Sequence, residues 1–206
     1  MTLESRHQPT GDRAMTTIET ERLLLRQWRD EDYEPFYQLN SDPRVMEHFP
    51  ALQTREQSDG GAQRLRSFID ECGWGLWATE VKGGAPFIGF IGLNRPRFEA
   101  HFTPCVEIGW RLAYEHWSRG YATEGARAAL RFAFESLSLD EIISMTVVAN
   151  RRSRNVMEKL GMVRDPEGDF DHPLIPAGHR TQRHVLYRIS RAEWEYRHRD
   201  PTTPSS

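Results

Sequence analysis

Polar residues and glycines with the types and spacing for ligand chemistry gather within residues 107–162. The segment Trp117-Ser118-Arg119-Gly120-Tyr121-Ala122 stands between a predicted strand and the best predicted helix of the chain. Gly120 permits close backbone approach and Ala122 is small, so a ligand can reach the free amides that begin this helix. Those N–H groups and the helix dipole favour an anion such as a phosphate. An ordinary strand-to-helix turn explains the same residues, because neither a Walker lysine nor a GxGxxG pattern accompanies them.

Asn150 and Ser153 form a second polar pair, directly after the next predicted strand. Asn150 can cap a short helix whose first turn contains Ser153. Alternatively, the Asn150 amide and the Ser153 hydroxyl face a ligand wedged between two neighbouring strands. The two roles are compatible, so the pair by itself selects neither of them.

Glu107 is the candidate for acid–base chemistry. It lies in residues 105–112, where apolar side chains alternate with Cys105, Glu107, Gly109 and Arg111, which is the pattern of a half-buried strand. A carboxylate with a raised pKa in reach of a substrate can act as a general base. A surface or ion-paired strand residue explains Glu107 equally well.

Hydrophobic periodicity predicts the elements that must position these residues. Strands are predicted over residues 21–29, 75–81, 86–93, 105–112, 142–149 and 183–189. Helices are predicted over residues 30–39, with Asp30 as the N-cap, and over 54–72, 121–137, 153–160 and 192–196. The pair Gly60-Gly61 weakens the first half of the helix over 54–72. The strand–helix–strand–helix–strand order of the second half indicates an α/β sandwich around a mixed sheet.

Length and composition describe one ordinary globular domain. The 206 residues suffice for a single core, which we place in residues 17–198, with a flexible extension at 1–16 and a disordered tail at 199–206. A net charge of −3 gives no reason to expect direct nucleic-acid binding. Two distant cysteines, Cys72 and Cys105, predict neither a disulfide nor a metal site. Because no apolar run reaches the roughly 18 residues of a membrane span and no signal-peptide core is present, we expect a cytoplasmic location.

Taken together, these motifs resemble the GNAT superfamily of acyl-CoA-dependent N-acetyltransferases. The central motif of that superfamily is Q/R-x-x-G-x-G/A, followed by a strand, N-x-x-[AS] and a helix that ends in E-K-x-G-F. This chain has Trp117-x-x-Gly120-x-Ala122, then Asn150-x-x-Ser153, then Glu158-Lys159-Leu160-Gly161-Met162. The resemblance covers residues 20–189, and it is the order and spacing of these individually weak motifs that make it specific.

Further segments are most similar to the RimJ/RimL branch of that superfamily. They are Ile108-Gly109-Trp110, Gly120-Tyr121-Ala122-Thr123-Glu124 and the opening Thr20-Glu21-Arg22-Leu23-Leu24-Leu25-Arg26. Two positions depart from the wider pattern. Trp117 replaces Gln or Arg, and Met157 replaces the Tyr that protonates the departing thiolate in many relatives, so Ser153 is the nearest substitute for that role.

The resemblance implies a mixed, mostly antiparallel central sheet with helices on both faces, splayed between its fourth and fifth strands. It implies acetyl-CoA as the co-substrate and no metal, with the pyrophosphate on the amides of residues 119–123 and the pantetheine arm along residues 110–112. Glu107 is then the base, and Ser153 donates to the thiolate. The implied cofactor-binding residues are Trp110, Leu112, Trp117, Arg119, Gly120, Tyr121, Ala122, Thr123, Asn150, Ser153 and Asn155.

The implied activity is acetylation of a primary amine, either a protein N-terminus or a small molecule such as a polyamine or an amino sugar. A catalytically silent acyl-CoA-binding sensor is the alternative, which Met157 leaves open. An unrelated α/β binding domain is the third. A homodimer is compatible with the first two.

The acceptor side is predicted only coarsely. Four acidic residues could attract a cationic amine, although a solvated loop over residues 164–172 is the favoured interpretation: Asp165, Glu167, Asp169 and Asp171. Two histidines could touch the acceptor, namely His172 and His184. Four aromatic residues could wall its pocket, although core packing explains most aromatic side chains: Trp28, Phe49, Trp74 and Trp77.

Overall fold

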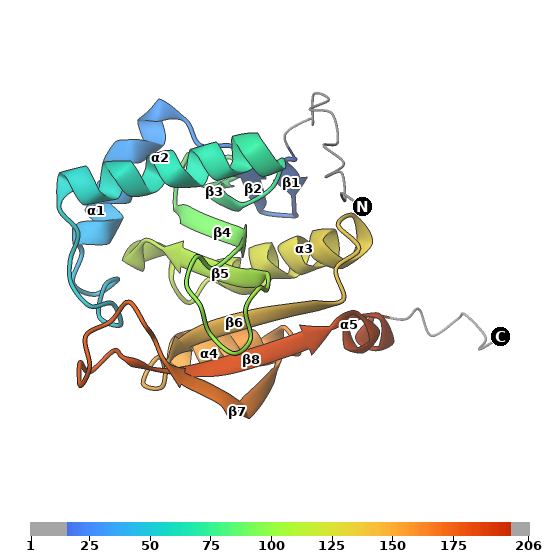
Figure 1. The fold of residues 1–206 in the computed structure, drawn as a ribbon. Helices are drawn as coiled ribbons and strands as arrows, with labels where there is room; N and C mark the ends of the chain where they lie inside the picture. The colour runs from blue at the N-terminus through green and yellow to red at the C-terminus, as the bar shows by residue number, and fades with distance from the viewer. Residues whose placement is uncertain (1–15, 199–206) are drawn as a thin grey trace, which may run out of the picture.

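One eight-stranded sheet runs through the molecule, in the order β1-β2-β3-β4-β5-β6-β8-β7 (Figure 1). The computed structural model describes residues 16–198, so the predicted tail 199–206 and the predicted extension 1–16, apart from its last residue, lie outside the described residues. The strands are β1 (Ile18–Glu19), β2 (Leu23–Arg26), β3 (Leu76–Val81), β4 (Gly89–Asn94), β5 (Glu107–Leu112), β6 (Glu141–Val147), β7 (Val163–Asp171) and β8 (Arg183–Ser190). Neighbouring strands are antiparallel except β5 and β6, so the predicted mixed, mostly antiparallel sheet is confirmed.

Helices cover both faces of the sheet, as predicted. They are α1 (Tyr33–Ser41), α2 (Arg55–Cys72), α3 (Tyr121–Glu135), α4 (Arg151–Lys159) and α5 (Arg191–Arg197). Adjacent residues of β4 show the layering, because successive side chains of a strand point to opposite faces. Phe90 packs edge-on against Phe36 of α1, whereas Ile91 lies so close to Gly125 of α3 that a Cβ there would meet its Cδ1 at 2.6 Å. No helix in the described part of the chain is long and apolar enough to cross a membrane.

Helix α3 lies close to the sheet because its buried stripe consists mostly of small residues. Ala126, Ala129, Leu130 and Ala133 are fully buried, and three of these four residues are alanines. Trp77 of β3 packs edge-on against the ring of Phe132 from the sheet side. The packing therefore holds the N-terminus of α3 in a defined place beside the end of β5.

Helix α2 runs unbroken through the Gly60-Gly61 pair that weakened its prediction. The Thr54 hydroxyl accepts a hydrogen bond from the Gln57 amide at 3.2 Å, and the Gln57 side-chain oxygen accepts one from the Thr54 amide at 2.9 Å. This reciprocal cap stabilises the first turn. Gly73, at φ 77°, ends the helix in the left-handed conformation that glycine adopts without strain. Good caps and tertiary packing thus outweigh the low helix propensity of two glycines.

The sheet splays between β5 and β6, which are the fourth and fifth strands of the sequence prediction because β1 was not predicted. Strands β4 and β5 pair over six positions, whereas β5 and β6 share one, Glu107 opposite Ile143. One residue further along, a side-chain hydrogen bond takes the place of backbone pairing: the Ser144 hydroxyl donates to the Ile108 carbonyl at 2.9 Å. Beyond that point the two strands separate and a gap opens between them.

Two expectations about local structure are wrong. Asp30 does not cap α1; instead residues Asp30–Asp32 form a 3-10 turn, and buried Asp32 accepts from the Arg29 amide and from Arg26. Residues 164–172 are not a solvated loop, because most of them form β7, an edge strand paired with β8 and interrupted by a bulge. The charged residues of β7 hide its strand character, since an edge strand exposed to solvent lacks a regular apolar pattern.

Candidate active site

A cavity of about 880 Å³ occupies the gap between β5 and β6 and extends to both faces of the sheet. Its wall combines β5, the start of α3, the end of β6 and α4 with α2, the segment after α1 and the loop after β4. Of the residues predicted for the site, the wall contains Glu107, Trp110, Leu112, Trp117, Gly120, Tyr121, Ala122, Thr123, Asn150, Ser153 and Asn155. The structure thus brings together residues that lie as far as 48 positions apart, from Glu107 to Asn155. Arg119 is the exception and lies outside the wall.

The N-terminus of α3 presents free amides to this cavity. Gly120 precedes the helix at φ 82°, and no side chain caps the helix. The first amide bonded within this turn is that of Glu124, which donates to the Gly120 carbonyl at 3.0 Å. The amides of residues 121–123 therefore have no acceptor in the helix, and a phosphate or another anion can take that place.

Arg22 and Glu124 tie the start of β2 to the first turn of α3. Glu124 accepts from the Arg22 amide at 2.8 Å, from the Arg22 guanidinium at 2.6 Å and from the Thr20 hydroxyl at 2.7 Å. Burial raises the pKa of Glu124, but these hydrogen bonds outweigh it and hold the pKa below its usual value. Arg22 also donates to the Arg119 carbonyl at 3.0 Å. The network fixes the turn that carries Gly120.

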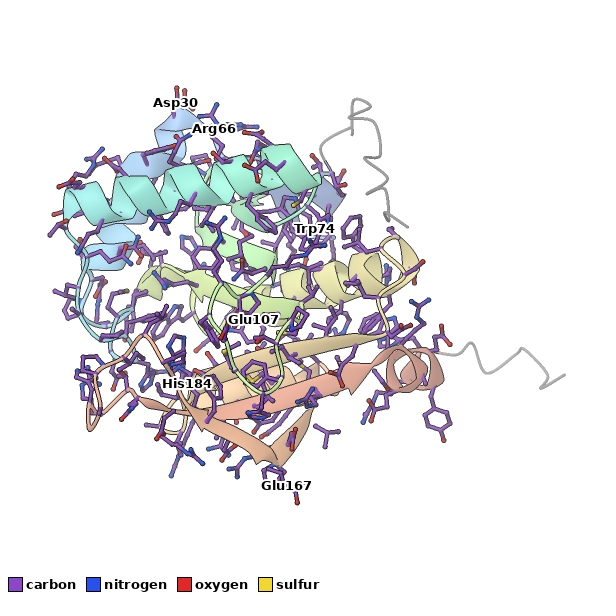
Figure 2. The ribbon with its side chains drawn as sticks, in the orientation of Figure 1. Asp30, Arg66, Trp74, Glu107, Glu167 and His184 are labelled. Carbon is purple, nitrogen blue, oxygen red and sulfur yellow. The ribbon has the colours of Figure 1, made fainter. Side chains whose placement is uncertain are left out.

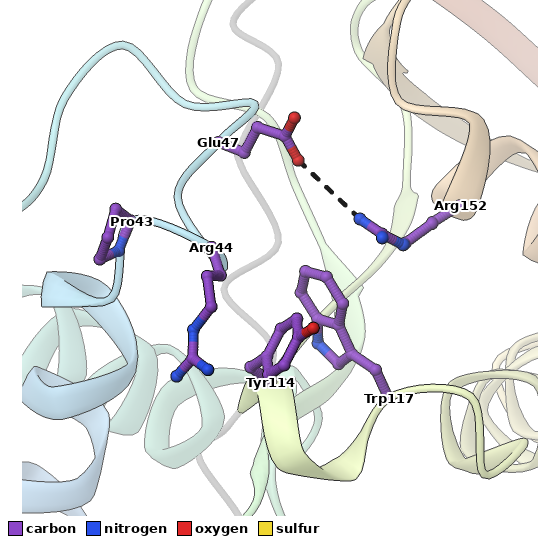
Figure 3. A pocket seen from close by; sticks show the side chains of 6 residues that line it. All are labelled: Pro43, Arg44, Glu47, Tyr114, Trp117 and Arg152. Carbon is purple, nitrogen blue, oxygen red and sulfur yellow. Dashed lines mark ion pairs between the residues drawn. The ribbon is translucent and has the colours of Figure 1, made fainter.

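Trp117 is held by its indole nitrogen, which donates to the Leu112 carbonyl at 2.7 Å. Within β5 the backbone groups of alternate residues point to the same side, so Trp110 and Leu112 present theirs toward the gap. The N–H of Leu112 and both the N–H and the C=O of Trp110 thus point into the gap between β5 and β6, where an additional strand could pair with them. Figure 3 shows Trp117 beside Tyr114, with the ion pair of Glu47 and Arg152, 3.8 Å long, above them.

Asn150 caps α4 and also orients Ser153. The Asn150 side-chain oxygen accepts from the Ser153 amide at 3.1 Å, as the sequence predicts for an N-cap. Its amide nitrogen donates to the Ser153 hydroxyl and to the Thr146 hydroxyl, each at 3.0 Å. Because the Ser153 oxygen accepts this bond, its own proton is free to be donated into the cavity. Met157, the residue at the Tyr position of many relatives, lies in the same wall and is 1% exposed.

Glu107 stands where β5 and β6 part. Figure 2 shows it near the middle of the molecule, between the layer of α1 and α2 and the strands β6 and β8. Burial raises the pKa of its carboxyl group to about 7, and a hydrogen bond with the Asn94 side chain opposes that shift. Among the described residues, no basic group lies within 4.0 Å to pair with it. A carboxylate that titrates near neutral pH is suited to accept a proton from an amine.

Arg111 is the main cavity residue that sequence reasoning did not select. It follows Glu107 on the same face of β5, toward α1 and α2. Its Nη1 donates to the Asn40 side-chain oxygen at 2.6 Å, and its guanidinium lies 3.9 Å from the centre of the Phe49 ring. Burial lowers its pKa to about 10, and its Nε is buried without a partner. The predicted alternation of residues 105–112 placed Arg111 beside Glu107 and was the signal that could have identified it.

The predicted aromatic wall is correct only for Phe49, which lines the cavity. Trp28, Trp74 and Trp77 lie in the core instead, at 1%, 5% and 0% exposure. Their prediction as wall residues is wrong because β3 and its flanks are covered on both faces, so large apolar side chains there have no open side. His172 and His184 do line the cavity, with ring centres 5.1 Å apart.

The acidic residues of β7 do not serve the cavity. Asp165 pairs with Arg188, and Asp169 pairs with Arg164. Asp171 approaches Arg183 at 3.4 Å, and none of the acidic residues of this strand lines the wall. Across the described residues, no cluster of His, Cys, Asp and Glu could hold a metal ion.

Comparison with known proteins places this site in a family. Residues 22–163 match the family described as "Acetyltransferase (GNAT) domain". The chain is 31% identical to FsC-acetyl coenzyme A-N(2)-transacetylase of Aspergillus fumigatus, over 88% of this chain and 79% of that protein. It is 29% identical to the uncharacterized N-acetyltransferase YnaD of Bacillus subtilis, over 86% of this chain and 98% of that protein.

Solved structures share the fold. A GNAT-family acetyltransferase from Bacillus anthracis superposes with a TM-score of 0.71 at 29% identity, over 86% of this chain and 99% of that one. A spermidine N-acetyltransferase from Vibrio cholerae, solved with CoA and spermine, reaches a TM-score of 0.64 at 19% identity, over 84% of this chain and 97% of that one. The second likeness is one of fold alone.

Proposed function

Because the chain belongs to the GNAT acetyltransferase family, we propose that it transfers the acetyl group of acetyl-CoA directly to a primary amine. One observation carries the proposal: a single cavity joins the free amides of α3 to Glu107 at the splay. The names of the relatives, a transacetylase and an N-acetyltransferase, support an enzyme over a catalytically silent acyl-CoA sensor. We further propose that the chain belongs to the RimJ/RimL-like branch, which the segments Ile108-Gly109-Trp110 and Gly120-Tyr121-Ala122-Thr123-Glu124 support.

The residues present fit the co-substrate. The uncapped start of α3 has free amides for the pyrophosphate of acetyl-CoA, and Gly120 leaves the approach to them open. The backbone groups of Trp110 and the Leu112 N–H can pair with the amides of the pantetheine arm, as an added strand would. Asn155 and Lys159 line the same side of the cavity and are available to the polar groups of the co-substrate.

The reaction consumes a neutral amine and releases a protonated thiol. The amine nitrogen attacks the thioester carbonyl carbon, the C–N bond forms, and the electron pair of the broken C–S bond leaves on sulfur. We assign the proton of the amine to the Glu107 carboxylate, directly or through one water. The Ser153 hydroxyl, oriented by Asn150, donates its proton to the sulfur and regains one from water. An α-amine with a pKa near 8 needs less help from Glu107 than a lysine-like amine near 10.4.

Two measurements test the proposal. Calorimetry should detect binding of CoA, and acetyl-CoA mixed with a panel of amines should release free thiol and yield acetylated product by mass spectrometry. Absence of CoA binding would remove the placement of the co-substrate. CoA binding without thiol release for any small amine, peptide or protein would instead favour the silent sensor.

A further inference from the structure

The cavity wall carries a strong excess of positive charge. Among the described residues, Glu107 is its only carboxylate, whereas its cations are Arg64, Arg95, Arg97, Arg111, Arg152 and Lys159. Within the same part of the chain, Arg152 alone of these six has an ion pair, the 3.8 Å contact with Glu47. Burial lowers the pKa of His172 and of His184, so at neutral pH these rings add no charge that would change the balance.

Four of the six cations surround the side of the cavity that lies away from α3. Arg64 comes from α2, and Arg95 and Arg97 come from the loop after β4. Arg95 lies over the Trp74 ring, 5.2 Å from its centre, close to the C-terminal end of α2. Arg111 stands on the face of β5 that also carries Glu107. The sheet therefore lies between these four guanidinium groups and the α3 amides, so under the proposed function they belong to the acceptor side of the cavity and not to the pyrophosphate side.

Arg111 has donors left for a ligand. Its Nη1 is used by Asn40, which is fully buried and in turn donates to the Ser58 hydroxyl at 2.9 Å. Neither Nε nor Nη2 has an acceptor among the described residues. These two nitrogens form one edge of the guanidinium, and a carboxylate binds such an edge through two parallel hydrogen bonds. A half-buried cation whose Nε is fully buried has lost part of its hydration, and a ligand that supplies the negative charge compensates for that loss.

We infer that the acceptor is an amine that also carries a carboxylate, which Arg111 binds while the amine is held at Glu107. The inference rests on the proposed acetyl transfer and names the substrate class of that same site. Glu107 and Arg111 are four residues apart on one strand, so their Cα atoms are separated by about 13 Å. An acceptor whose amine and carboxylate lie several bonds apart, such as an ω-amino acid or a peptide with an acidic side chain, suits that separation.

The same excess of positive charge in the wall disfavours a polycationic acceptor. A polyamine would bring several positive charges toward four unpaired guanidinium groups and find one carboxylate. The acidic residues of β7 that could have attracted it all lie outside the wall, and three of the four are paired with Arg164, Arg183 and Arg188. The wall thus selects against a substrate whose second end is positive.

Three acceptors of equal chain length test the inference. They are 6-aminohexanoate, hexylamine and 1,6-diaminohexane, which end in a carboxylate, a methyl group and a second amine. With saturating acetyl-CoA at low salt, kcat/KM should be at least tenfold higher for 6-aminohexanoate than for either of the others. Equal values, or a preference for the diamine, would overturn the inference while leaving the proposed acetyl transfer intact.

Variants assign the preference to Arg111. In Arg111→Gln the ratio of kcat/KM between 6-aminohexanoate and hexylamine should fall to about one, with CoA affinity close to that of the wild type. The matched control is Arg131→Gln on the exposed face of α3, which removes the same charge far from the cavity and should keep the ratio. An unchanged ratio in Arg111→Gln would contradict the assignment.

A binding measurement separates this inference from the proposed function. Adipate carries carboxylates and no amine, so its binding to the CoA-loaded protein does not depend on turnover. Its Kd should rise at least tenfold in Arg111→Gln, and Arg111→Lys should recover part of the loss. If adipate binds the wild type and Arg111→Gln equally, or neither of them, the inference is wrong whether or not any amine is acetylated.

Discussion

The two sides of the cavity are built differently. The side on which we propose the co-substrate, around the start of α3 and α4, is made largely of backbone amides and of residues close together in the sequence, such as Gly120 and Thr123. The acceptor side draws single side chains from β4, β5, α2 and two loops, among them Asn94, Arg64 and Phe49. Backbone groups bind any ligand of the right shape and charge, whereas scattered side chains can change one at a time. Under the proposed function, a single substitution on the acceptor side is therefore expected to change acceptor preference and to leave co-substrate binding intact.

The largest effect should come from blocking the co-substrate side of the cavity, which is built from backbone amides. Gly120→Glu places a carboxylate where we propose the pyrophosphate, and it forces a φ of 82° on a residue with a side chain. The Kd for CoA should rise more than 100-fold in calorimetry. Gly83→Glu is the matched control, because Gly83 has a similar φ of 67° in an open turn with nothing within 4 Å of an added Cβ. CoA affinity equal in both variants would refute the placement on α3.

Substitution of Glu107 on the acceptor side should lower turnover and leave CoA affinity unchanged. With a pKa of about 7, Glu107 is ionised above neutral pH and able to accept a proton. Glu107→Gln should lower kcat about 100-fold between pH 7.5 and 9, which is within the usual range for a general base. The loss should shrink below pH 7, where the wild-type carboxyl is protonated, and the limb of the pH–rate profile near pH 7 should vanish. A profile of unchanged shape would rule out Glu107 as the base.

A smaller effect on kcat is expected from substitution of Ser153, which contributes to both the co-substrate side and the acceptor side of the cavity. A thiolate is a fair leaving group, so loss of the hydroxyl in Ser153→Ala should lower kcat only about tenfold. The deficit should be smaller with an acyl donor whose thiol has a lower pKa, since such a thiol needs less protonation. Equal deficits for the two donors, measured by product formation, would assign Ser153 to binding alone.

The smallest effect concerns stability. The folded-state pKa of Glu107, about 7, lies above its ordinary value of 4.5, so the folded protein binds this proton more tightly than the unfolded chain. Its ionisation therefore costs stability as pH rises from about 4.5 to 7, and the full cost is present above pH 7. Glu107→Gln should raise the Tm at pH 8, by about 2 to 4 °C for each kcal/mol relieved, and leave it nearly unchanged at pH 4.5. An increase of equal size at both pH values would contradict a Glu107 carboxyl group whose pKa is raised by desolvation.

Much of the fold could be predicted from local patterns. The alternation over residues 105–112, the small-residue stripe of α3 and the Asn150 cap correspond to real elements within a few residues of their predicted ends. Apart from the Asp30 cap, the missed local structures are edge strands. Strand β1 is two residues long, and β7 is rich in charge, because an edge strand need bury only part of one face. Their pairing is decided by the neighbouring strand and not by their own sequence.

The sequence by itself determined the free amides at the start of α3 and the Asn150 cap of α4, because a helix start and a capped turn are consequences of local order along the chain. The tertiary structure alone decided the acceptor side. Burial shifts the pKa of Glu107 and of Arg111, and only the packing of α2 and the loops over β5 produces that burial. The same packing moved Trp28, Trp74 and Trp77 into the core and left Arg111 without a counter-charge. Desolvation depends on every neighbour in space, and no pattern along the chain records it.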